Sequence, residues 1–155
     1  MVRSNTGKRG LFSRMRRTGG GDLEIVKSEE EWRRLLTAEQ FRVLRRNGTE
    51  RAFSNEMVRP DADGVYRCAG CDAGLFRADA KFNSGTGWPS FTQSEADGVE
   101  LHKDYRLGIP RTEVRCRRCG GHLGHVFNDG PGPNGKRYCI NGCALSPGTN
   151  VEPGT

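Results

Sequence analysis

No apolar run in this 155-residue chain approaches the roughly 20 residues that a membrane-spanning helix needs. The N-terminus also lacks the apolar core of a secretory signal peptide. We therefore expect a cytoplasmic protein that does not associate with a membrane. The alternative compartment is an organelle, because the N-terminus is rich in arginine and free of acid, as transit peptides are.

Acidic residues are absent from residues 1–20, where six basic residues lie: Arg3, Lys8, Arg9, Arg14, Arg16 and Arg17. The net charge of +6 belongs to this segment, since residues 21–155 carry 19 basic and 19 acidic side chains. Because the charges of residues 21–155 balance, this part of the chain gives no reason to expect nucleic-acid binding. We predict a disordered basic tail over 1–21, one folded domain over 22–148 and a flexible C-terminus over 149–155.

Hydrophobic residues are scarce, at 34% of the chain, while glycine is abundant, with 22 residues. This composition indicates a loop-rich β fold whose core needs a metal or another staple. Four segments alternate like strands and are separated by Gly, Pro, Asp and Asn turns: 64–68, 99–103, 112–116 and 137–141. The chain is therefore predicted to be mainly β.

Two short helices are predicted near the N-terminal side of this β region. Ser28 with Glu31, and Thr37 with Gln40, have the spacing of capping boxes. Asn47, followed by glycine, tolerates the backbone conformation that ends a helix. Both helices are amphipathic, so we expect them to cover one side of a sheet.

Four of the six cysteines form two Cys-x-x-Cys pairs, Cys68 with Cys71 and Cys116 with Cys119. Four thiolates in two such pairs are what a closed, tetrahedral structural Zn²⁺ site needs. Two small disulfides or a redox pair are the alternatives, and neither explains why the motif occurs twice. A site filled by four sulfurs has no open position for a substrate, so we expect the metal to be structural.

Cys139 lies outside these pairs, in a segment that alternates like a strand. Its neighbours Arg137 and Asn141 should share its face, opposite Tyr138 and Ile140. A nearby guanidinium favours the nucleophilic thiolate, which makes Cys139 a candidate for chemistry. The alternative is a small buried apolar residue.

Two histidines and a tryptophan could complete such a site. His122 and His125 stand in a Gly-rich segment that we interpret as a loop. They could protonate a departing oxygen, or they could be solvated loop side chains. Trp88, in a glycine-flanked turn, is either a core residue or a pocket wall suited to a methyl or thioether group.

Together these residues closely resemble the methionine-R-sulfoxide reductases of the B type. The resemblance covers about residues 28–145 and rests on the two cysteine pairs and on four segments in the order of that family: 81–91, 111–116, 119–127 and 137–141. It implies a β-tent (Mss4-like) fold of two twisted antiparallel sheets, with short N-terminal helices and a structural zinc site. The domain over 22–148 would then be the reductase domain.

The resemblance also implies a reaction, in which the R epimer of methionine sulfoxide in proteins or peptides is reduced during repair of oxidative damage. Cys139 would attack the sulfoxide sulfur and become a sulfenic acid. His122 and His125 would hold and protonate the oxygen, and Trp88 would seat the methyl group.

Four further positions match the same family pattern. Arg137 and Asn141 would position the catalytic cysteine and its surroundings. Phe127 would line the substrate pocket, and Asp129 would steady its histidine side.

The chain departs from many family members at Thr86, in the substrate-binding turn, where they carry a resolving cysteine. Cys143 is the possible substitute, but four residues of extended strand span about 13 Å, whereas a disulfide joins Cα atoms within about 7 Å. Gly142 could bend the chain. We expect thioredoxin or another thiol to reduce the Cys139 sulfenic acid directly, with Cys143 as the alternative resolver or a buried small residue.

Two rival functions remain open at this point. A zinc-ribbon module could bind nucleic acid or a partner, although it leaves Trp88 and Cys139 without a role. A different zinc-stapled β enzyme could act on thiol adducts, for example with glutathione. The segments 87–91 and 137–141 favour the reductase. We expect a monomer, because no oligomer seam is evident.

Overall fold

The computed structural model of the protein describes residues 23–55 and 58–146. The predicted tail over 1–21 and the predicted C-terminus over 149–155 lie outside the described residues. Within the described part, no helix has the length and apolar character needed to cross a membrane.

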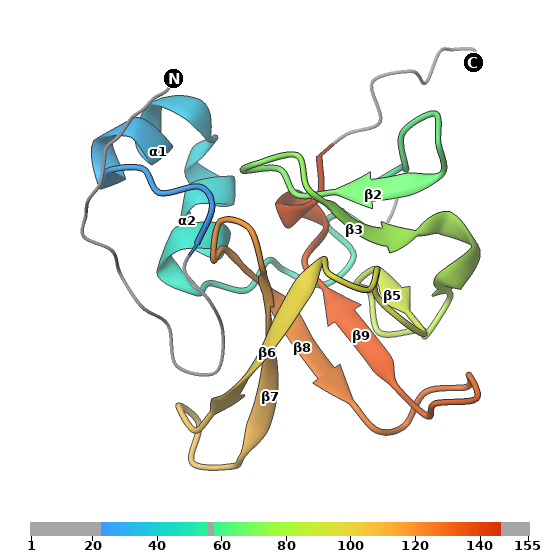
Figure 1. The fold of residues 1–155 in the computed structure, drawn as a ribbon. Coiled ribbons are helices and arrows are strands. Elements are labelled where there is room, and N and C mark those ends of the chain that lie inside the picture. The colour runs from blue at the N-terminus through green and yellow to red at the C-terminus, as the bar shows by residue number, and fades with distance from the viewer. Residues whose placement is uncertain (1–22, 56–57, 147–155) are drawn as a thin grey trace.

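The two predicted helices are confirmed as α1 (Glu29–Leu35) and α2 (Ala38–Arg46). Both capping boxes form, at Ser28 and at Thr37. Asn47 ends α2 with a left-handed backbone, at φ 58°. Helix α2 packs against strand β8 (His122–Phe127) and the 3-10 turn η2 (Gly142–Ala144), so it covers one end of the larger sheet (Figure 1).

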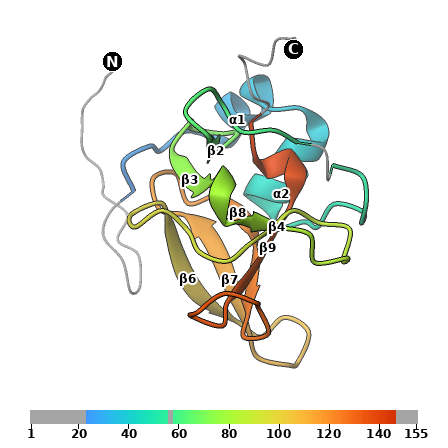
Figure 2. The ribbon, with the colours of Figure 1, turned by 90° about the vertical axis from the view of Figure 1, so that its right-hand side faces the viewer.

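Over residues 23–55 and 58–146 the chain is mainly β, with two antiparallel sheets, as predicted (Figures 1 and 2). The smaller sheet pairs β2 (Val65–Arg67) with β3 (Gly74–Arg77). The larger sheet has the order β4-β5-β9-β8-β7-β6. Its other strands are β4 (Lys81–Phe82), β5 (Ser90–Phe91), β6 (Val99–Asp104), β7 (Arg111–Cys116) and β9 (Arg137–Ile140), and the turn η1 (Ala78–Ala80) precedes β4.

Each of the four predicted strands is present, but the interpretation of the histidine segment as a loop was wrong. It is β8, which lies between β7 and β9. Two of its side chains, Leu123 and Val126, reach the core, and Gly124 lets the backbone of β9 approach closely. These contacts make a Gly-containing segment a central strand.

One hydrophobic core joins the two sheets and both helices. Phe76 of β3 stacks on Phe91 of β5, with ring centroids 4.3 Å apart. Leu44 of α2 and Leu123 of β8 belong to the same buried cluster. Because this core holds one face of β9, the opposite face is available for Cys139.

Candidate active site and metal centre

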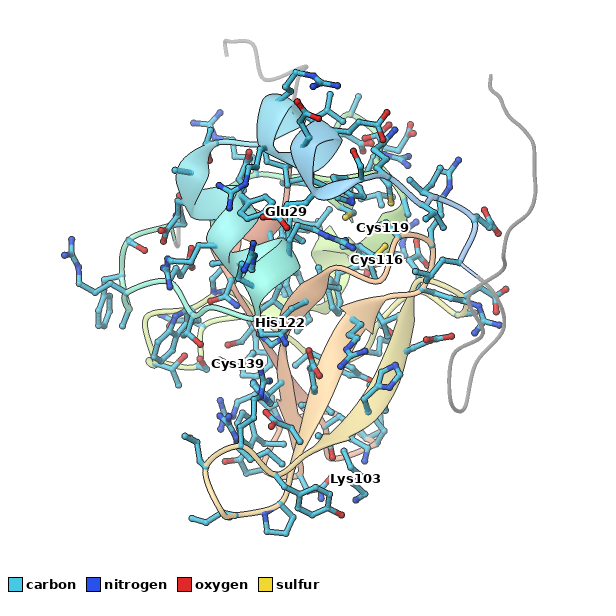
Figure 3. All side chains as sticks on the ribbon, turned by 90° about the vertical axis from the view of Figure 1, so that its left-hand side faces the viewer. Glu29, Lys103, Cys116, Cys119, His122 and Cys139 are labelled. Carbon is cyan, nitrogen blue, oxygen red and sulfur yellow. The ribbon has the colours of Figure 1, made fainter. Side chains whose placement is uncertain are left out.

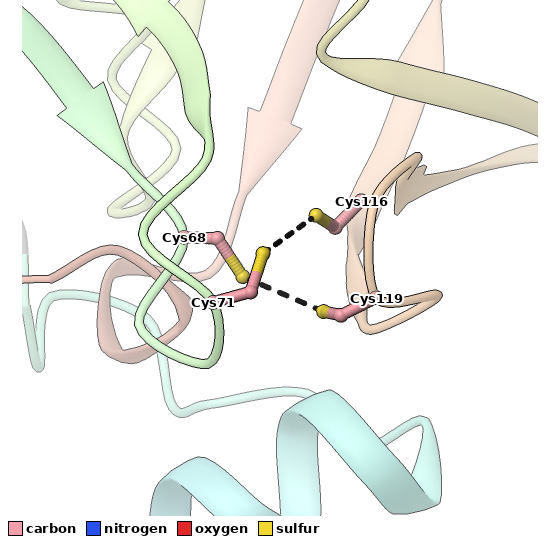
Figure 4. A group of neighbouring side chains, drawn as sticks. All are labelled: Cys68, Cys71, Cys116 and Cys119. Carbon is pink, nitrogen blue, oxygen red and sulfur yellow. Dashed lines mark hydrogen bonds between the residues drawn. The ribbon is translucent and has the colours of Figure 1, made fainter. Parts of the chain in front are cut away.

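The four paired cysteines converge although 44 residues separate the two pairs in the sequence. Sγ of Cys68 lies 3.8 Å from Sγ of Cys119, and Sγ of Cys71 lies 3.5 Å from Sγ of Cys116 (Figure 4). All four sulfurs lie within 4.8 Å of one another. Bonds of about 2.3 Å from sulfur to a tetrahedral ion place the sulfurs about 3.8 Å apart, so this donor set fits a metal site.

The metal centre connects the two sheets. Cys68 directly follows β2, and Cys116 is the last residue of β7. Two donors point at the sulfurs, the N–H of Gly70 toward Cys68 at 3.3 Å and the guanidinium of Arg45 toward Cys119 at 3.9 Å. Such contacts stabilise thiolate ligands, and Arg45 brings helix α2 to the same centre.

Cys139 lies on the face of β9 that looks away from the core. Tyr138 and Ile140 are buried, whereas Cys139 is half-buried. In the sheet register, Cys139 pairs with Ser90 of β5 on one side and with His125 of β8 on the other. Paired residues share a face, so the register alone brings His125 beside the thiol.

A β-bulge places both histidines on this face. In a regular strand, residues three apart point to opposite sides of the sheet. Gly124 pairs with Val114 and His122 with the next residue of β7, so β8 contains one extra residue, Leu123. The bulge reverses the alternation. The imidazoles of His122 and His125 accordingly meet, with ring centroids 5.5 Å apart.

Each histidine is held by a buried carboxylate that sequence analysis missed. Nδ1 of His122 lies 2.6 Å from Oε2 of Glu113, and Nε2 of His125 lies 2.7 Å from Oδ2 of Asp104. Glu113 lies within a predicted strand and Asp104 follows another, but their partners come from β8. Only the strand pairing, which is a long-range property, could have connected them.

Hydrogen bonds from these and other side chains change the pKa values of the two acids. Burial raises the pKa of Glu113, but hydrogen bonds from His122 and Arg115 outweigh it and bring the pKa to about 2. Hydrogen bonds from Arg106, and from His125, hold the pKa of Asp104 well below its usual range. Both acids are therefore charged at neutral pH. Burial lowers the pKa of His125, although its bond to Asp104 acts in the opposite direction.

A cavity of about 130 Å³ opens beside Cys139. Its volume accommodates only a few heavy atoms. Five of the predicted site residues meet in its wall, together with three that were not predicted: Cys139, His125, Asn141, Trp88 and Phe127, with Thr49, Arg111 and Gly124. His122 lies behind His125, and its Nε2 is buried with no hydrogen-bond partner in the described part of the chain.

One loop residue, Glu50, ties two walls of the cavity together. The indole N–H of Trp88 donates to the Glu50 carbonyl at 3.0 Å, and the Glu50 N–H donates to Oδ1 of Asn141 at 2.9 Å. The Asn141 amide in turn donates to the Leu123 carbonyl at 3.0 Å. Asn141 therefore has a fixed orientation beside the cysteine.

Arg137 approaches Cys139 along the same face of the strand. Its Nε donates to Asp129 at 2.8 Å, and its guanidinium lies 4.6 Å from the centre of the Phe127 ring. Asp129, expected on the histidine side, contacts Arg137, whereas the histidines contact Glu113 and Asp104. Any effect of Asp129 on the cavity thus passes through this arginine.

The surroundings of the Cys139 thiol change its pKa in opposite directions. Burial raises its pKa, whereas the guanidinium of Arg137 and a hydrogen bond with the Thr86 side chain lower it. The Thr86 hydroxyl also lies 2.8 Å from the Ser84 hydroxyl. The raised pKa means that most of the thiol is protonated before a substrate arrives.

Cys143 lies in η2, beyond the end of β9, and is not part of the cavity wall. Both Cys139 and Cys143 are free thiols. Burial, reinforced by the charge of Glu50, raises the pKa of Cys143 to about 12. A thiol with this pKa is a poor nucleophile at neutral pH.

The four-cysteine cluster and Cys139 occupy different parts of the molecule. Figure 3 shows Cys116 and Cys119 toward the helices, with His122 and Cys139 farther along the larger sheet. None of the four metal-site cysteines lines the cavity. A metal ion held by these four cysteines would therefore lie outside the cavity beside Cys139.

Comparison with known proteins assigns this arrangement to a family. The family described as the SelR domain matches residues 36–147, which include every residue of the cavity wall and all four metal-site cysteines. The chain belongs to this family. The resemblance inferred from the sequence motifs is thereby confirmed.

Curated relatives in the MsrB family match most of the chain, and each is named peptide methionine sulfoxide reductase MsrB. The relative from Leptospira interrogans is 54% identical over 123 residues, which cover 79% of this chain and 94% of the relative. The relative from Leifsonia xyli is 56% identical over 129 residues, covering 82% and 93%. A relative from Methanosarcina barkeri is 54% identical, covering 83% and 91%.

Proposed function

We propose that this MsrB family member reduces the R epimer of methionine sulfoxide, in peptides and proteins, to methionine. The observation that carries the proposal is the position of Cys139, whose thiol opens into a small cavity between Trp88 and His125. The names of the curated relatives support the reaction class. A role in the repair of proteins after oxidative damage follows from this substrate.

The chemistry transfers one oxygen atom from substrate to enzyme. The Cys139 sulfur attacks the sulfoxide sulfur, and His125, with His122 behind it, holds and protonates the sulfoxide oxygen. The bond between the two sulfurs and the sulfur–oxygen bond of the substrate then break as the oxygen passes to the Cys139 sulfur, so methionine leaves and Cys139 becomes a sulfenic acid. The thiol proton of Cys139 replaces the proton that the imidazole gave to the oxygen. Because the imidazoles are fixed by Asp104 and Glu113, they are oriented before the substrate arrives.

The indole of Trp88 provides the seat for the methyl group. Contacts of sulfur and its substituents with an aromatic ring contribute about 0.3–1.5 kcal/mol. Arg137 and Asn141 position Cys139, and Asp129 acts through Arg137. Phe127 completes the wall of the substrate cavity, and Thr86 contributes a hydrogen bond to the thiol.

Thioredoxin or another thiol is the proposed reductant of the Cys139 sulfenic acid. Thr86 occupies the position where many family members carry a resolving cysteine, and Cys143 has a strongly raised pKa. Two external thiols would return Cys139 to the reduced state and release water. The cytoplasm, which keeps such thiols reduced, suits this cycle. We expect the protein to act as a monomer.

Zn²⁺ is the ion that we assign to the four-cysteine centre. Four thiolates with these separations match its preferred ligands, and they leave no position for a substrate. Cys68, Cys71, Cys116 and Cys119 would hold the ion and thereby hold the two sheets together.

The proposal is tested with a peptide that contains either epimer of methionine sulfoxide, with dithiothreitol as the reductant. We expect turnover of the R epimer alone, and loss of at least about 1,000-fold in kcat for Cys139→Ser. Cys143→Ser is the matched control and should retain most of the activity. Equal turnover of both epimers, or full activity of Cys139→Ser, would remove the assignment.

A further inference from the structure

Glu50 is the least expected residue of the site, because it is a charged side chain that is only 1% exposed. It lies in the loop that follows α2, about 90 residues before β9 in the sequence. Three donors surround its carboxylate. Oε1 accepts from the N–H of Cys143 at 2.9 Å and from the side-chain amide of Asn55 at 3.0 Å, and Oε2 accepts from the N–H of Gly142 at 2.6 Å.

All three partners of the Glu50 side chain are donors, which makes a carboxylate specifically suitable. A glutamine would turn an N–H₂ group toward at least one backbone N–H and leave it unpaired. An unpaired buried donor is costly, since it has lost its contact with water. The Glu50 carboxylate therefore fastens the η2 turn, which directly follows Asn141 and β9.

The backbone of Glu50 makes the two contacts that orient the cavity walls. Its carbonyl accepts from the indole of Trp88, and its N–H donates to the side chain of Asn141. The same residue thus holds the aromatic wall, the amide beside Cys139 and the turn after β9. Because its side chain is anchored in that turn, its backbone cannot move independently of Cys139.

We propose that Glu50 is the positioning residue that sets Trp88 and Asn141 against Cys139. This inference rests on the proposed function and deepens it. It identifies the residue that fixes the indole of Trp88, which contacts the substrate methyl group, relative to the Cys139 thiol. Glu50 is not one of the described residues that line the cavity. A displacement of about 1 Å in such a site lowers a rate by up to about 100-fold.

The decisive variant is Glu50→Gln, measured in a Trp32→Phe background. The chain has two tryptophans, so Trp88 is then the only indole and its emission reports the cavity wall. Leu75→Ala in the same background is the matched control, because Leu75 is fully buried in β3 and does not line the cavity. Each folded, zinc-loaded protein is assayed for kcat and KM with the R-sulfoxide peptide at a temperature below its unfolding transition.

We expect Glu50→Gln to shift the Trp88 emission to longer wavelength and to lower kcat/KM by on the order of 10- to 100-fold, through both kcat and KM. Leu75→Ala should lower the unfolding temperature without either change, which separates positioning from stability. A kcat/KM of Glu50→Gln within threefold of its background protein overturns the proposal, whatever the emission does.

A second variant and a second measurement cover the two ways in which this experiment could fail. Should Glu50→Gln fail to fold, Asn55→Ala removes one donor of the three and is expected to lower kcat/KM several-fold, while unchanged activity overturns the proposal. Should the parent protein reduce neither epimer, the proposed function fails, and the Trp88 emission of Glu50→Gln alone then decides the role of Glu50. An unchanged emission would overturn it.

Discussion

At the scale of single residues, the site depends on buried acidic side chains whose histidine partners come from another strand of the same sheet. Glu113 and Asp104 each hold one imidazole, and neither acid is more than 4% exposed. The motifs identified Cys139 and the histidines, because those residue types are rare and reactive. They could not identify the acids, since glutamate and aspartate are common and only the pairing of β6, β7 and β8 gives these two a role.

The titration of Glu113 leads to a prediction about acid stability. Its pKa falls from the ordinary 4.5 to about 2 in the folded protein. A depressed pKa contributes stability that is fully present above pH 4.5 and is lost as the pH falls toward 2. We expect the difference in free energy of unfolding between the protein and Glu113→Gln to shrink by about 2 kcal/mol between pH 7 and pH 3.

Urea denaturation at pH 7, 5, 4 and 3 measures this difference. Glu30→Gln is the matched control, because the Glu30 side chain is 84% exposed. The control should follow the parent protein at every pH. A Glu113→Gln difference that stays constant from pH 7 to pH 3 would contradict the assigned cause.

At the scale of elements, local sequence signals predicted the helices and the strand of Cys139. The bulge in β8 could not be predicted in this way, because it depends on how β8 pairs within the sheet. Capping boxes act within four residues, so Ser28 and Thr37 were sufficient to predict where the helices begin. The bulge in β8 depends on its pairing with β7 and was missed. Gly124, a glycine inside an otherwise apolar and histidine-containing segment, was the available signal for it.

Gly124 gives the prediction that belongs to this scale. A Cβ at this position would lie 2.1 Å from the carbonyl oxygen of Cys139, so Gly124→Ala must push β8 and β9 apart. We expect a loss of about 1–3 kcal/mol in the free energy of unfolding, together with loss of reductase activity.

Gly108→Ala is the comparison variant, measured by the same urea denaturation. Its Cβ would meet no atom within 4 Å, although its φ of 78° imposes a strain of about 1 kcal/mol. It should keep its activity. A Gly124→Ala protein that is as stable and active as Gly108→Ala would argue against close packing of β8 on β9.

At the scale of the whole molecule, the metal centre joins two sheets that share one core with two short α-helices in the described part of the chain. Cys68 and Cys71 lie in the turn between β2 and β3 of the small sheet, whereas Cys116 ends β7 and Cys119 lies in the turn from β7 to β8. The spacing of the cysteines was enough to predict this centre, because two Cys-x-x-Cys pairs supply all four ligands. It could not show which strands the centre connects.

Removal of the metal should therefore unfold the protein and not merely inactivate it. We expect a strong chelator, or Cys71→Ser, to lower the unfolding temperature by at least about 10 °C and to reduce the β signal in circular dichroism. Cys143→Ser, which changes a cysteine outside the centre, should leave both quantities unchanged. An apoprotein with unaltered stability would contradict a structural role.

The central claim is that the Cys139 sulfur takes the oxygen from the sulfoxide. It is tested most directly by a single turnover of the R-sulfoxide peptide without reductant, followed by mass spectrometry of the protein. We predict one methionine formed per protein chain and the mass of one oxygen atom, trapped by a sulfenic-acid reagent, on Cys139. A Cys139–Cys143 disulfide would contradict reduction by an external thiol alone. Methionine produced while both Cys139 and Cys143 remain unmodified would contradict the claim itself.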